Sequence, residues 1–302
     1  MRIAIATCAA VPPQLDEDEI LLTALAARGA RAERVVWDDP SAAWDRFDTV
    51  VVRSTWDYPR KLDAFLEWVD AIGSRLRNAA PLVRWNADKA HLADLAGAGI
   101  PVVPTTLVEP GEDLPPLDGE VVVKPTISAG ARDTGRFGPG AHQDARDLAS
   151  RLLAEGRSAL VQPYIASVDE LGETALVFID GSYSHAARKR AVLRPDEVAP
   201  VRDDEIGGAE VMYDPDIVQP GSASPQEVSV AESAIAYLRA RFGDDPLYAR
   251  VDLVTGDDGV PLLLELEAVE PNLFLRHSAT AADRLAAAIL ASGARGSRPA
   301  RA

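Results

Sequence analysis

The pattern of apolar residues changes once along this chain, and that change limits the fold more than any other feature. Up to about residue 85, strand-like segments at Arg2–Thr7, Ala32–Trp37 and Thr49–Val52 alternate with helical periodicity. From Glu120 onwards, short strands follow one another and are joined by turns. Strand–helix alternation is typical of a small parallel sheet, and successive hairpins form antiparallel sheets. The pattern predicts an α/β unit followed by an α+β part.

Two helices are expected in the first unit. Asp16 and Glu19 form a pattern like a capping box at the start of the first helix, and Gly29 follows its end. The second helix has apolar residues spaced along one face between 62 and 76. Ligands of parallel sheets bind beyond the carboxyl ends of the strands. The segment Arg53–Tyr58 directly follows one such end and is therefore a candidate binding segment.

The rest of the chain divides into recognisable elements. The expected strands are Val121–Lys124, Ala159–Gln162, Thr174–Ile179, Ser182–Ala187, Leu247–Val254 and Val260–Glu267. The expected helices are Ala87–Ala98, a helix capped by Ser224 and Glu227 that runs to Phe242, and Ala279–Ala291. Asp180-Gly181 predicts a tight hairpin. We place an N-terminal substrate unit at 1–86, a central unit at 87–165, a C-terminal unit at 166–292 and a disordered tail at 293–302.

Charge and composition exclude several classes of protein. The net charge of −16 argues against nucleic acid or an anionic membrane as the main partner. The single cysteine, Cys8, excludes an internal disulfide. No apolar run approaches the roughly 18 residues that cross a bilayer, and the chain opens on a strand rather than on a signal peptide. A cytoplasmic location is expected, and any phosphate site must be built locally.

The strongest chemical pattern is a pair of acidic strands near the C-terminus. Arg250 and Asp252 lie two residues apart in one strand, and Glu265 and Glu267 lie two residues apart in the next. Alternate residues of a strand share a face, so a hairpin brings these side chains onto one surface. Carboxylates gathered among apolar neighbours need a cation, and hard oxygen ligands suit Mg²⁺. The alternative is an exposed face with scattered charge, which the apolar flanking residues disfavour.

A second pattern combines a lysine with glycines. Lys124 ends an apolar strand, and the loop Thr126–Gly138, which contains Ser128 and Gly130, follows it. Glycines let backbone amides approach a phosphate closely, although a mobile surface loop has a similar composition. The loop is neither a Walker loop nor a dinucleotide-binding motif. Only four of the 31 basic residues are lysines. Three of them lie in the patterns described in this section, where a compact ammonium is favoured.

The third pattern is Gln162-Pro163-Tyr164-Ile165, which is followed by Asp169 and Glu170. A proline after a strand leaves backbone groups free to contact an adenine edge, and a nearby carboxylate can bind ribose hydroxyls. Taken alone, the segment is an ordinary strand end.

In their order along the chain these segments resemble the ATP-grasp superfamily, to which glutathione synthetases and D-alanine–D-alanine ligases belong, and the likeness covers nearly the whole chain. It implies an ATP-grasp fold preceded by a Rossmann-like domain. It also implies a role for each matching residue. Lys89 and Lys124 would contact the phosphates of ATP, and the loop from Ser128 would close over the transferred phosphate. Gln162 to Ile165 would line the adenine pocket, and Asp169 or Glu170 would bind ribose. One or two magnesium ions would be held by Asp252, Glu265 and Glu267.

One position departs from the superfamily pattern. The usual last motif is Glu-x-Asn, whereas this chain has Glu265-x-Glu267, so the role of Glu267 is less secure. A narrower likeness, to the group containing the cycloserine-forming ligase, lies in Arg53–Tyr58, in 172–179, in His185-x-x-Arg188-Lys189 and in Glu267–Leu275. The residues expected to recognise substrate are Thr55, Trp56, Asp57, Tyr58, His185, Arg188 and Lys189, each of which has a structural role as its alternative.

The implied reaction uses ATP and magnesium to convert a carboxylate into an acyl phosphate, which an amine then attacks. Arg250 is the candidate for stabilising the oxyanion that forms, and Lys124 and Ser128 complete the catalytic set. The partners are then small carboxylates and amines, in one molecule or two. Two other interpretations remain open, an ATP-dependent phosphotransferase and a nucleotide-binding regulator without turnover. A homodimer is the commonest oligomer of soluble proteins, although the sequence leaves the oligomeric state open.

Overall fold

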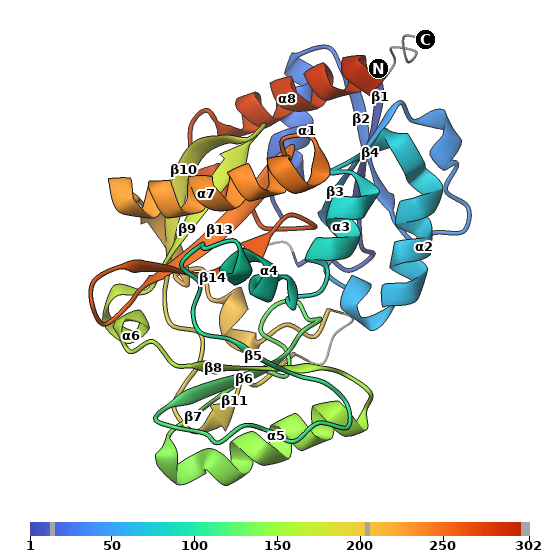
Figure 1. Cartoon of the computed structure of the whole chain (residues 1–302). Coiled ribbons are helices and arrows are strands. Elements are labelled where there is room, and N and C mark those ends of the chain that lie inside the picture. The colour runs from blue at the N-terminus through green and yellow to red at the C-terminus, as the bar shows by residue number, and fades with distance from the viewer. Residues whose placement is uncertain (13–15, 203–205, 297–302) are drawn as a thin grey trace.

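The computed structural model describes residues 1–12, 16–202 and 206–296, which form three sheets with helices packed against them (Figure 1). The strands are β1 (Arg2–Thr7), β2 (Arg31–Val36), β3 (Thr49–Ser54), β4 (Leu76–Arg77), β5 (Thr106–Val108), β6 (Val121–Pro125), β7 (Gly135–Phe137), β8 (Ala159–Pro163), β9 (Glu173–Ile179), β10 (Ser182–Lys189), β11 (Glu197–Val198), β12 (Val218–Gly221), β13 (Tyr248–Thr255) and β14 (Pro261–Glu267). The helices are α1 (Asp18–Ala27), α2 (Leu62–Ile72), α3 (Ala80–Asn86), α4 (His91–Gly97), α5 (His142–Ala154), α6 (Ser167–Leu171), α7 (Pro225–Phe242) and α8 (Ala281–Gly296).

The first sheet is parallel, in the order β2-β1-β3-β4, as the strand–helix alternation predicts. The predicted capping box of its first helix is wrong. Helix α1 begins at Asp18, and its N-cap, Glu17, makes no side-chain capping bond. Asp16 instead accepts a hydrogen bond from the backbone N–H of Asp18 (2.9 Å). Glu17 and Asp18 are both buried, so this turn brings acidic side chains inside the molecule.

The second sheet is antiparallel, in the order β12-β10-β9-β13-β14, and its two faces differ. One face packs on α7 in a cluster that includes Leu176, Phe178 and Val251. On the other face Val177 and Tyr248 pack at one end against α8. Farther along β13 the same face carries charged residues instead, because alternate residues of a strand share a face. The strand pattern therefore changes from apolar to charged, and this change positions the site.

Local turn and cap chemistry in this half of the chain confirms the predictions. Asp180 and Gly181 have positive φ (49° and 69°) and join β9 to β10. At the start of α7, the Ser224 side chain accepts the backbone N–H of Glu227, and the Glu227 carboxylate accepts that of Ser224. The predicted last helix extends further than expected, to Gly296. The rest of the predicted disordered tail, 297–302, lies outside the described residues.

The third sheet, in the order β11-β7-β6-β8-β5, lies over α5 at the bottom of Figure 1. The sequence analysis missed α5, although Ala145, Leu148, Ala149 and Leu152 have helical spacing and are all buried. The edge strand β11 comes from beyond residue 166 and pairs with β7. The expected short helix at 87–98 is present but shorter than predicted. Helix α4 covers His91–Gly97, and a turn separates it from α3, which the sequence analysis did not predict.

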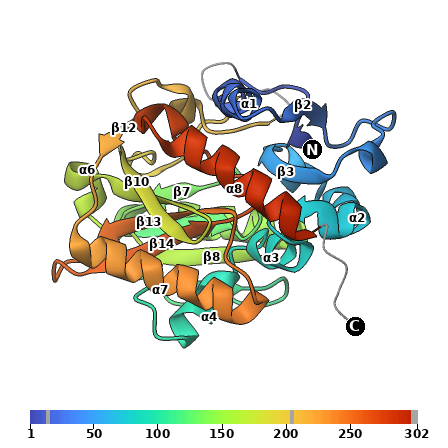
Figure 2. The same cartoon turned by 90° about the horizontal axis from the view of Figure 1, so that it is seen from above.

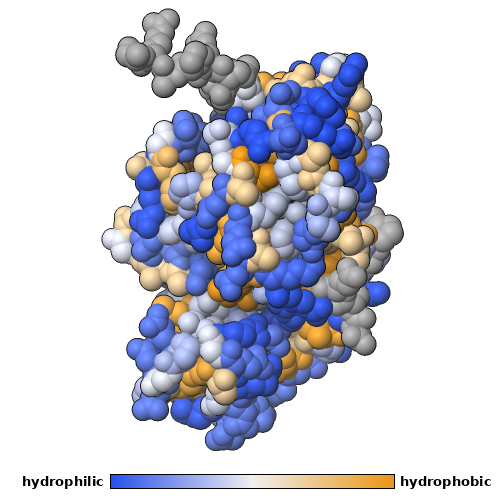
Figure 3. All heavy atoms as spheres, turned by 90° about the vertical axis from the view of Figure 1, so that its right-hand side faces the viewer, coloured by the Kyte–Doolittle hydropathy of each residue, from blue (hydrophilic) through white to orange (hydrophobic). Residues whose placement is uncertain are grey.

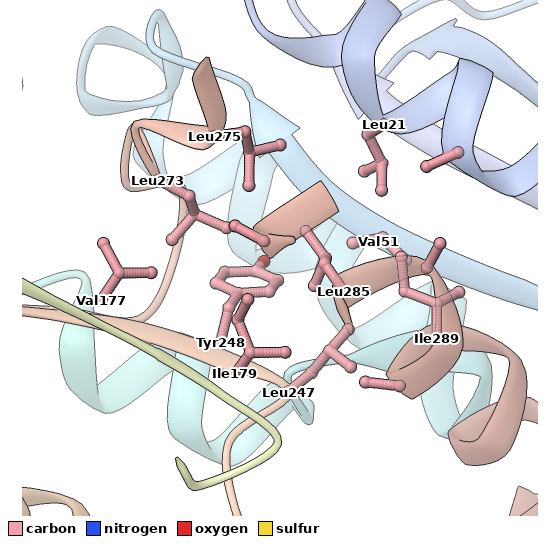
Figure 4. Close-up of a cluster of buried hydrophobic side chains, with 14 of the residues drawn as sticks. Leu21, Val51, Val177, Ile179, Leu247, Tyr248, Leu273, Leu275, Leu285 and Ile289 are labelled. Atoms are coloured by element: carbon pink, nitrogen blue, oxygen red, sulfur yellow. The ribbon is translucent and has the colours of Figure 1, made fainter. Parts of the chain in front are cut away.

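The parallel sheet and the second sheet share one hydrophobic core. Leu21 of α1 and Val51 of β3 pack with Tyr248 of β13 and with Leu285 and Ile289 of α8 (Figure 4). Seen from above, α8 crosses the molecule between α1 and α7 (Figure 2). Burial of this common apolar surface stabilises the relative position of the two units.

The surface is largely polar. On the face shown in Figure 3, hydrophilic residues predominate and hydrophobic ones are scattered among them. Among the described residues, no helix combines the length and the apolar composition that a membrane span requires.

Candidate active site

A cavity of about 420 Å³ is lined by strands of the second and third sheets and by segments that adjoin the parallel sheet, among them Glu17, Trp56 and Tyr58. Its polar lining includes Glu17, Tyr58, Lys89, His91, Lys124, Ser128, Gln162, Glu173, Lys189, Arg250, Glu265, Glu267, Glu270, Asn272, Arg276 and His277. The antiparallel register of β13 and β14 places Arg250 opposite Glu267, and Asp252 opposite Glu265. The two acidic strands therefore meet as the sequence predicts.

The three predicted metal ligands form one cluster. Carboxylate oxygens of Asp252, Glu265 and Glu267 lie within 4.8 Å of one another. Oxygen ligands that converge at the edge of an open cavity fit Mg²⁺, which binds through a few carboxylates and keeps positions for phosphate or water. These residues could therefore hold a magnesium ion that faces a nucleotide in the cavity.

Cations already surround these carboxylates. Arg250 donates to Asp252 (Nε to Oδ1, 2.8 Å) and its Nη2 lies 2.7 Å from Oε1 of Glu267. Lys189 donates to Asp252 (2.8 Å) and to Glu173 (2.7 Å). Asp252 is fully buried, so this ion pairing is needed to offset the desolvation of its charge.

The charged environment moves neighbouring pKa values in opposite directions. Burial acts to raise the pKa of Glu265, but the ammonium groups of Lys89 and Lys124 lower it to about 2. Burial raises the pKa of Glu267 to about 7, although Arg250 opposes the shift. Burial, with the Glu267 carboxylate, raises the pKa of Glu270 to about 8. The site therefore combines a fixed anion with carboxyls that titrate near neutral pH.

The lysines and the glycine-rich loop meet at one side of the cavity. Lys124 is buried at the end of β6, and burial lowers its pKa. The Lys89 ammonium donates to the backbone carbonyl of Ser128 (2.7 Å) and lies 3.4 Å from Glu265. Gly130 has φ +62° and accepts a hydrogen bond from the backbone N–H of Ala209 (2.7 Å). The loop is thus joined to a second loop across the cavity.

The predicted adenine segment lines the same cavity, on the strand next to that of Lys124. Gln162, Pro163, Tyr164 and Ile165 are all in contact with it. The Gln162 amide donates to Thr105 Oγ1 (2.8 Å), which fixes its orientation.

The predicted ribose ligand is directed elsewhere. Asp169 accepts two hydrogen bonds from Arg136 (2.8 Å each) and one from the Tyr164 hydroxyl (2.6 Å). Glu170 lines a separate, smaller pocket. Neither carboxylate belongs to the described lining of the main cavity.

The predicted substrate residues are divided between the cavity and other sites. Trp56, Tyr58 and Lys189 line the cavity. Thr55 is fully buried, and Asp57 is buried with Trp37 Nε1 (2.8 Å) and Lys61 (3.0 Å) as partners. The remaining two predicted residues also lie outside the described cavity lining: a ring nitrogen of His185 is 3.0 Å from the carbonyl of Leu273, and Arg188 donates to Thr174 Oγ1 (2.6 Å) beside the smaller pocket.

Several lining residues carried no role of their own in the sequence analysis, although Glu270 and Asn272 lie in the segment Glu267–Leu275 that resembles the cycloserine-forming group. Glu17 is 3% exposed, and its Oε2 has no hydrogen-bond partner among the described residues. Glu270, Asn272, Arg276 and His277 lie in the loop that follows β14. The sequence held little to identify Glu17, which was taken for part of a helix start. Sequence reasoning could have identified the loop, because it directly follows the acidic strand.

The fold and the site define an ATP-grasp ligase, an enzyme that forms carbon–nitrogen bonds. A D-alanine–D-alanine ligase from Bacillus anthracis in complex with ATP has the same fold, with a TM-score of 0.64 at 15% identity, and covers 98% of each chain. A RimK domain ATP-grasp protein from Sphaerobacter thermophilus likewise aligns with a TM-score of 0.64 at 19% identity, over 96% of this chain and 100% of that chain.

Closer relatives identify the family. Residues 3–78 match the family model of the D-cycloserine synthetase DcsG N-terminal domain. The cycloserine biosynthesis protein DcsG of Streptomyces lavendulae is 40% identical over 283 residues, which cover 89% of this chain and 91% of that protein. The crystal structure of D-cycloserine synthetase DcsG superimposes with a TM-score of 0.87 at 37% identity, over 98% of this chain and 100% of that one. The chain belongs to the DcsG family of ATP-grasp ligases.

Proposed function

We propose that this enzyme uses Mg-ATP to activate the carboxylate of O-ureido-D-serine and closes it into D-cycloserine. The proposal rests on one observation above the others: Glu265, Glu267, Arg250, Lys89 and Lys124 line one cavity, and carboxylate oxygens of Glu265 and Glu267 converge with an oxygen of the fully buried Asp252. The 40% identity to the cycloserine biosynthesis protein DcsG supports the choice of substrate.

The residues divide the work of phosphoryl transfer between them. Lys89 and Lys124 contact the phosphates, and the loop at Ser128 and Gly130 excludes water so that the acyl phosphate is not hydrolysed. The three carboxylates would hold a magnesium ion, which would neutralise negative charge on the phosphates. Gln162 to Ile165 hold the adenine.

Arg250 then acts at the second step. The ureido nitrogen that is bonded to oxygen attacks the acyl carbon, which forms the carbon–nitrogen bond and a tetrahedral oxyanion. The nitrogen loses its proton and phosphate leaves as the carbonyl re-forms, and the carbamoyl group on that nitrogen is then lost by hydrolysis as carbon dioxide and ammonia. The guanidinium of Arg250 is held by Asp252 and Glu267, so its position is fixed before charge develops. Preorganised donors of this kind stabilise an oxyanion without further rearrangement.

The test is ADP release from Mg-ATP with O-ureido-D-serine, compared with a panel of amino acids and dipeptides, with and without hydroxylamine. We expect ADP release with O-ureido-D-serine and no added amine, and a hydroxamate when hydroxylamine is present. Release with a different acid would keep the ligase mechanism and replace the substrate. Silence across the panel with ATP still bound would contradict the proposal and favour a regulator.

Asp252→Asn separates an enzyme from a nucleotide-binding regulator. The change removes the charge that Arg250 and Lys189 neutralise and one metal ligand, so we expect turnover to fall by at least about 10²-fold, the usual scale for a lost electrostatic contact. ATP affinity measured without magnesium should change far less. Because breaking a buried ion pair can cost about 3–5 kcal/mol, thermal unfolding must be measured in parallel. Full turnover in a folded variant would contradict the assignment.

A further inference from the structure

The backbone that follows β14 is held almost entirely by side chains. Five consecutive carbonyls each accept one side-chain hydrogen bond, from residue 268 to residue 272. The donors, in that order, are Asn78 (2.7 Å), Tyr248 (2.9 Å), Trp56 (3.0 Å), Arg53 (2.9 Å) and Arg250 (3.0 Å). An irregular segment without a strand partner needs such donors, and here they fix one conformation.

Two of these donors belong to the segment that the sequence analysis singled out as a substrate segment. Arg53 is 4% exposed, and its guanidinium lies over the Tyr248 ring (5.5 Å) while donating to the Pro271 carbonyl. Trp56 lines the cavity and donates its indole N–H to the Glu270 carbonyl. The N-terminal unit therefore holds the backbone at Glu270 and Pro271 in place.

Glu270 differs from the other carboxylates of the cavity. Glu267 is paired with Arg250 (2.7 Å) and Glu265 with Lys89 (3.4 Å). Within the described residues, no hydrogen bond or ion pair joins the Glu270 carboxylate to another residue, yet it lines the same cavity three positions after Glu267. A half-buried carboxylate without a donor is costly unless a ligand supplies one.

We propose that Glu270 binds the N–H groups of the substrate, and that Trp56 and Arg53 are positioning residues that direct it. The inference rests on the proposed function, whose substrate carries an ammonium group on the carbon next to the carboxylate that is activated. Glu270 adjoins the metal-binding strand, so a nitrogen that it holds lies close to the acyl group formed there. The ligand class is an ammonium or other N–H donor carried by a small carboxylic acid.

The test compares Glu270→Gln, Trp56→Phe and the double variant with the wild-type enzyme. Hydrogen bonds to a charged group are worth about 10- to 100-fold in affinity, so we expect the KM for O-ureido-D-serine to rise by about that factor in Glu270→Gln. Its Mg-ATP affinity should stay close to the wild-type value. Trp56→Phe keeps the ring and removes the N–H, and should raise the same KM.

Non-additivity identifies positioning. If Trp56 acts through Glu270, the KM of the double variant for O-ureido-D-serine should be no higher than that of Glu270→Gln alone. Trp85→Phe is the matched control, because it removes an indole N–H bond of similar length (to Asp94, 2.8 Å) away from the cavity lining. It should leave KM unchanged. An unchanged KM in Glu270→Gln, or fully additive effects in the double variant, would overturn the proposal.

A binding measurement keeps this proposal distinct from the proposed function. Calorimetry with O-ureido-D-serine and with the same acid lacking its ammonium group, both in the presence of Mg-ADP, needs no turnover. If Glu270→Gln weakens only the ammonium-bearing ligand while the wild-type enzyme makes no acyl phosphate, the nitrogen site stands and the ligase substrate is wrong. Equal weakening of both ligands would overturn the nitrogen site.

Discussion

At the scale of single residues, the site is built from close pairs of opposite charge. Lys89, Lys124 and Lys189 all line the cavity, whereas Lys61 lies on the surface beside Asp38. In a chain whose other basic residues are arginines, these ammonium groups sit where a planar guanidinium would fit poorly. Their positive charges keep nearby carboxylates ionised, whereas burial alone would favour the protonated form of those groups.

His91 gives a prediction about stability against pH. It is 4% exposed, its Nδ1 lies 2.8 Å from the Asp88 carbonyl, and burial, with a smaller effect of Lys89, lowers its pKa to about 4. The unfolded chain takes up the proton near pH 6.5, before the folded protein does. Stability is therefore lost as pH falls from about 6.5 to 4, by at most about 1.4 kcal/mol per pH unit.

Urea unfolding of His91→Leu at several pH values checks this. The variant lacks the titration, so the advantage of the wild-type protein over it should shrink steadily below pH 6.5. A difference that stays constant between pH 7.5 and pH 4.5 would show that His91 is protonated equally in both states.

At the scale of elements, the catalytic loop depends on close backbone contact. Gly130 has φ +62°, and a Cβ there would lie 3.0 Å from the Cα of Gly208 in the facing loop. Any side chain would strain the backbone and push the two loops apart. The loop after β14 depends on hydrogen bonds instead, because each of its carbonyls from 268 to 272 has a side-chain donor.

Gly130→Ala should reduce product formation far more than it reduces stability. A displacement of about 1 Å near reacting groups can cost on the order of 10²-fold in rate. Because the loop excludes water, we also expect more ADP released per product formed. Gly140→Ala is the control, since a Cβ at Gly140 has nothing within 4 Å. Equal behaviour of the two variants would contradict a role for loop contact in coupling.

At the scale of the whole molecule, strands of two sheets and segments that adjoin the third form a single cavity. The core common to the parallel sheet and the second sheet fixes one side of it, and the sheet on α5 provides the other. A ligand that touches all three units stabilises the folded state by mass action. Nucleotide and metal binding should therefore appear as an increase in the stability of the whole chain.

Thermal unfolding with and without ligands checks this. At 100 times its dissociation constant, Mg-ATP should add about 2.7 kcal/mol to the free energy of unfolding. ATP with EDTA should give a smaller rise in Tm, because the Asp252, Glu265 and Glu267 cluster then lacks its ion. Identical Tm values with Mg-ATP and with ATP plus EDTA would contradict a nucleotide-linked metal site.

Sequence reasoning succeeded where a feature depends on neighbours along the chain. The β9–β10 hairpin, the Ser224 cap and the placement of Asp252 and Glu265 on one surface were all predicted, because turn chemistry and strand alternation act over a few residues. It failed at α5, whose helical spacing was present but was not recognised between strands, and at the supposed capping box of Asp16.

The sequence by itself determined the class of fold, the order of most elements and the acidic residues that face one another. Tertiary structure decided which of the candidates reach the cavity. In the folded protein Asp57 pairs with Trp37 and Asp169 pairs with Arg136, whereas Glu17 and Glu270 line the cavity. The reason is physical: a charged side chain goes to the best compensating partner available when it is desolvated, and that partner is often on a segment far away in the sequence.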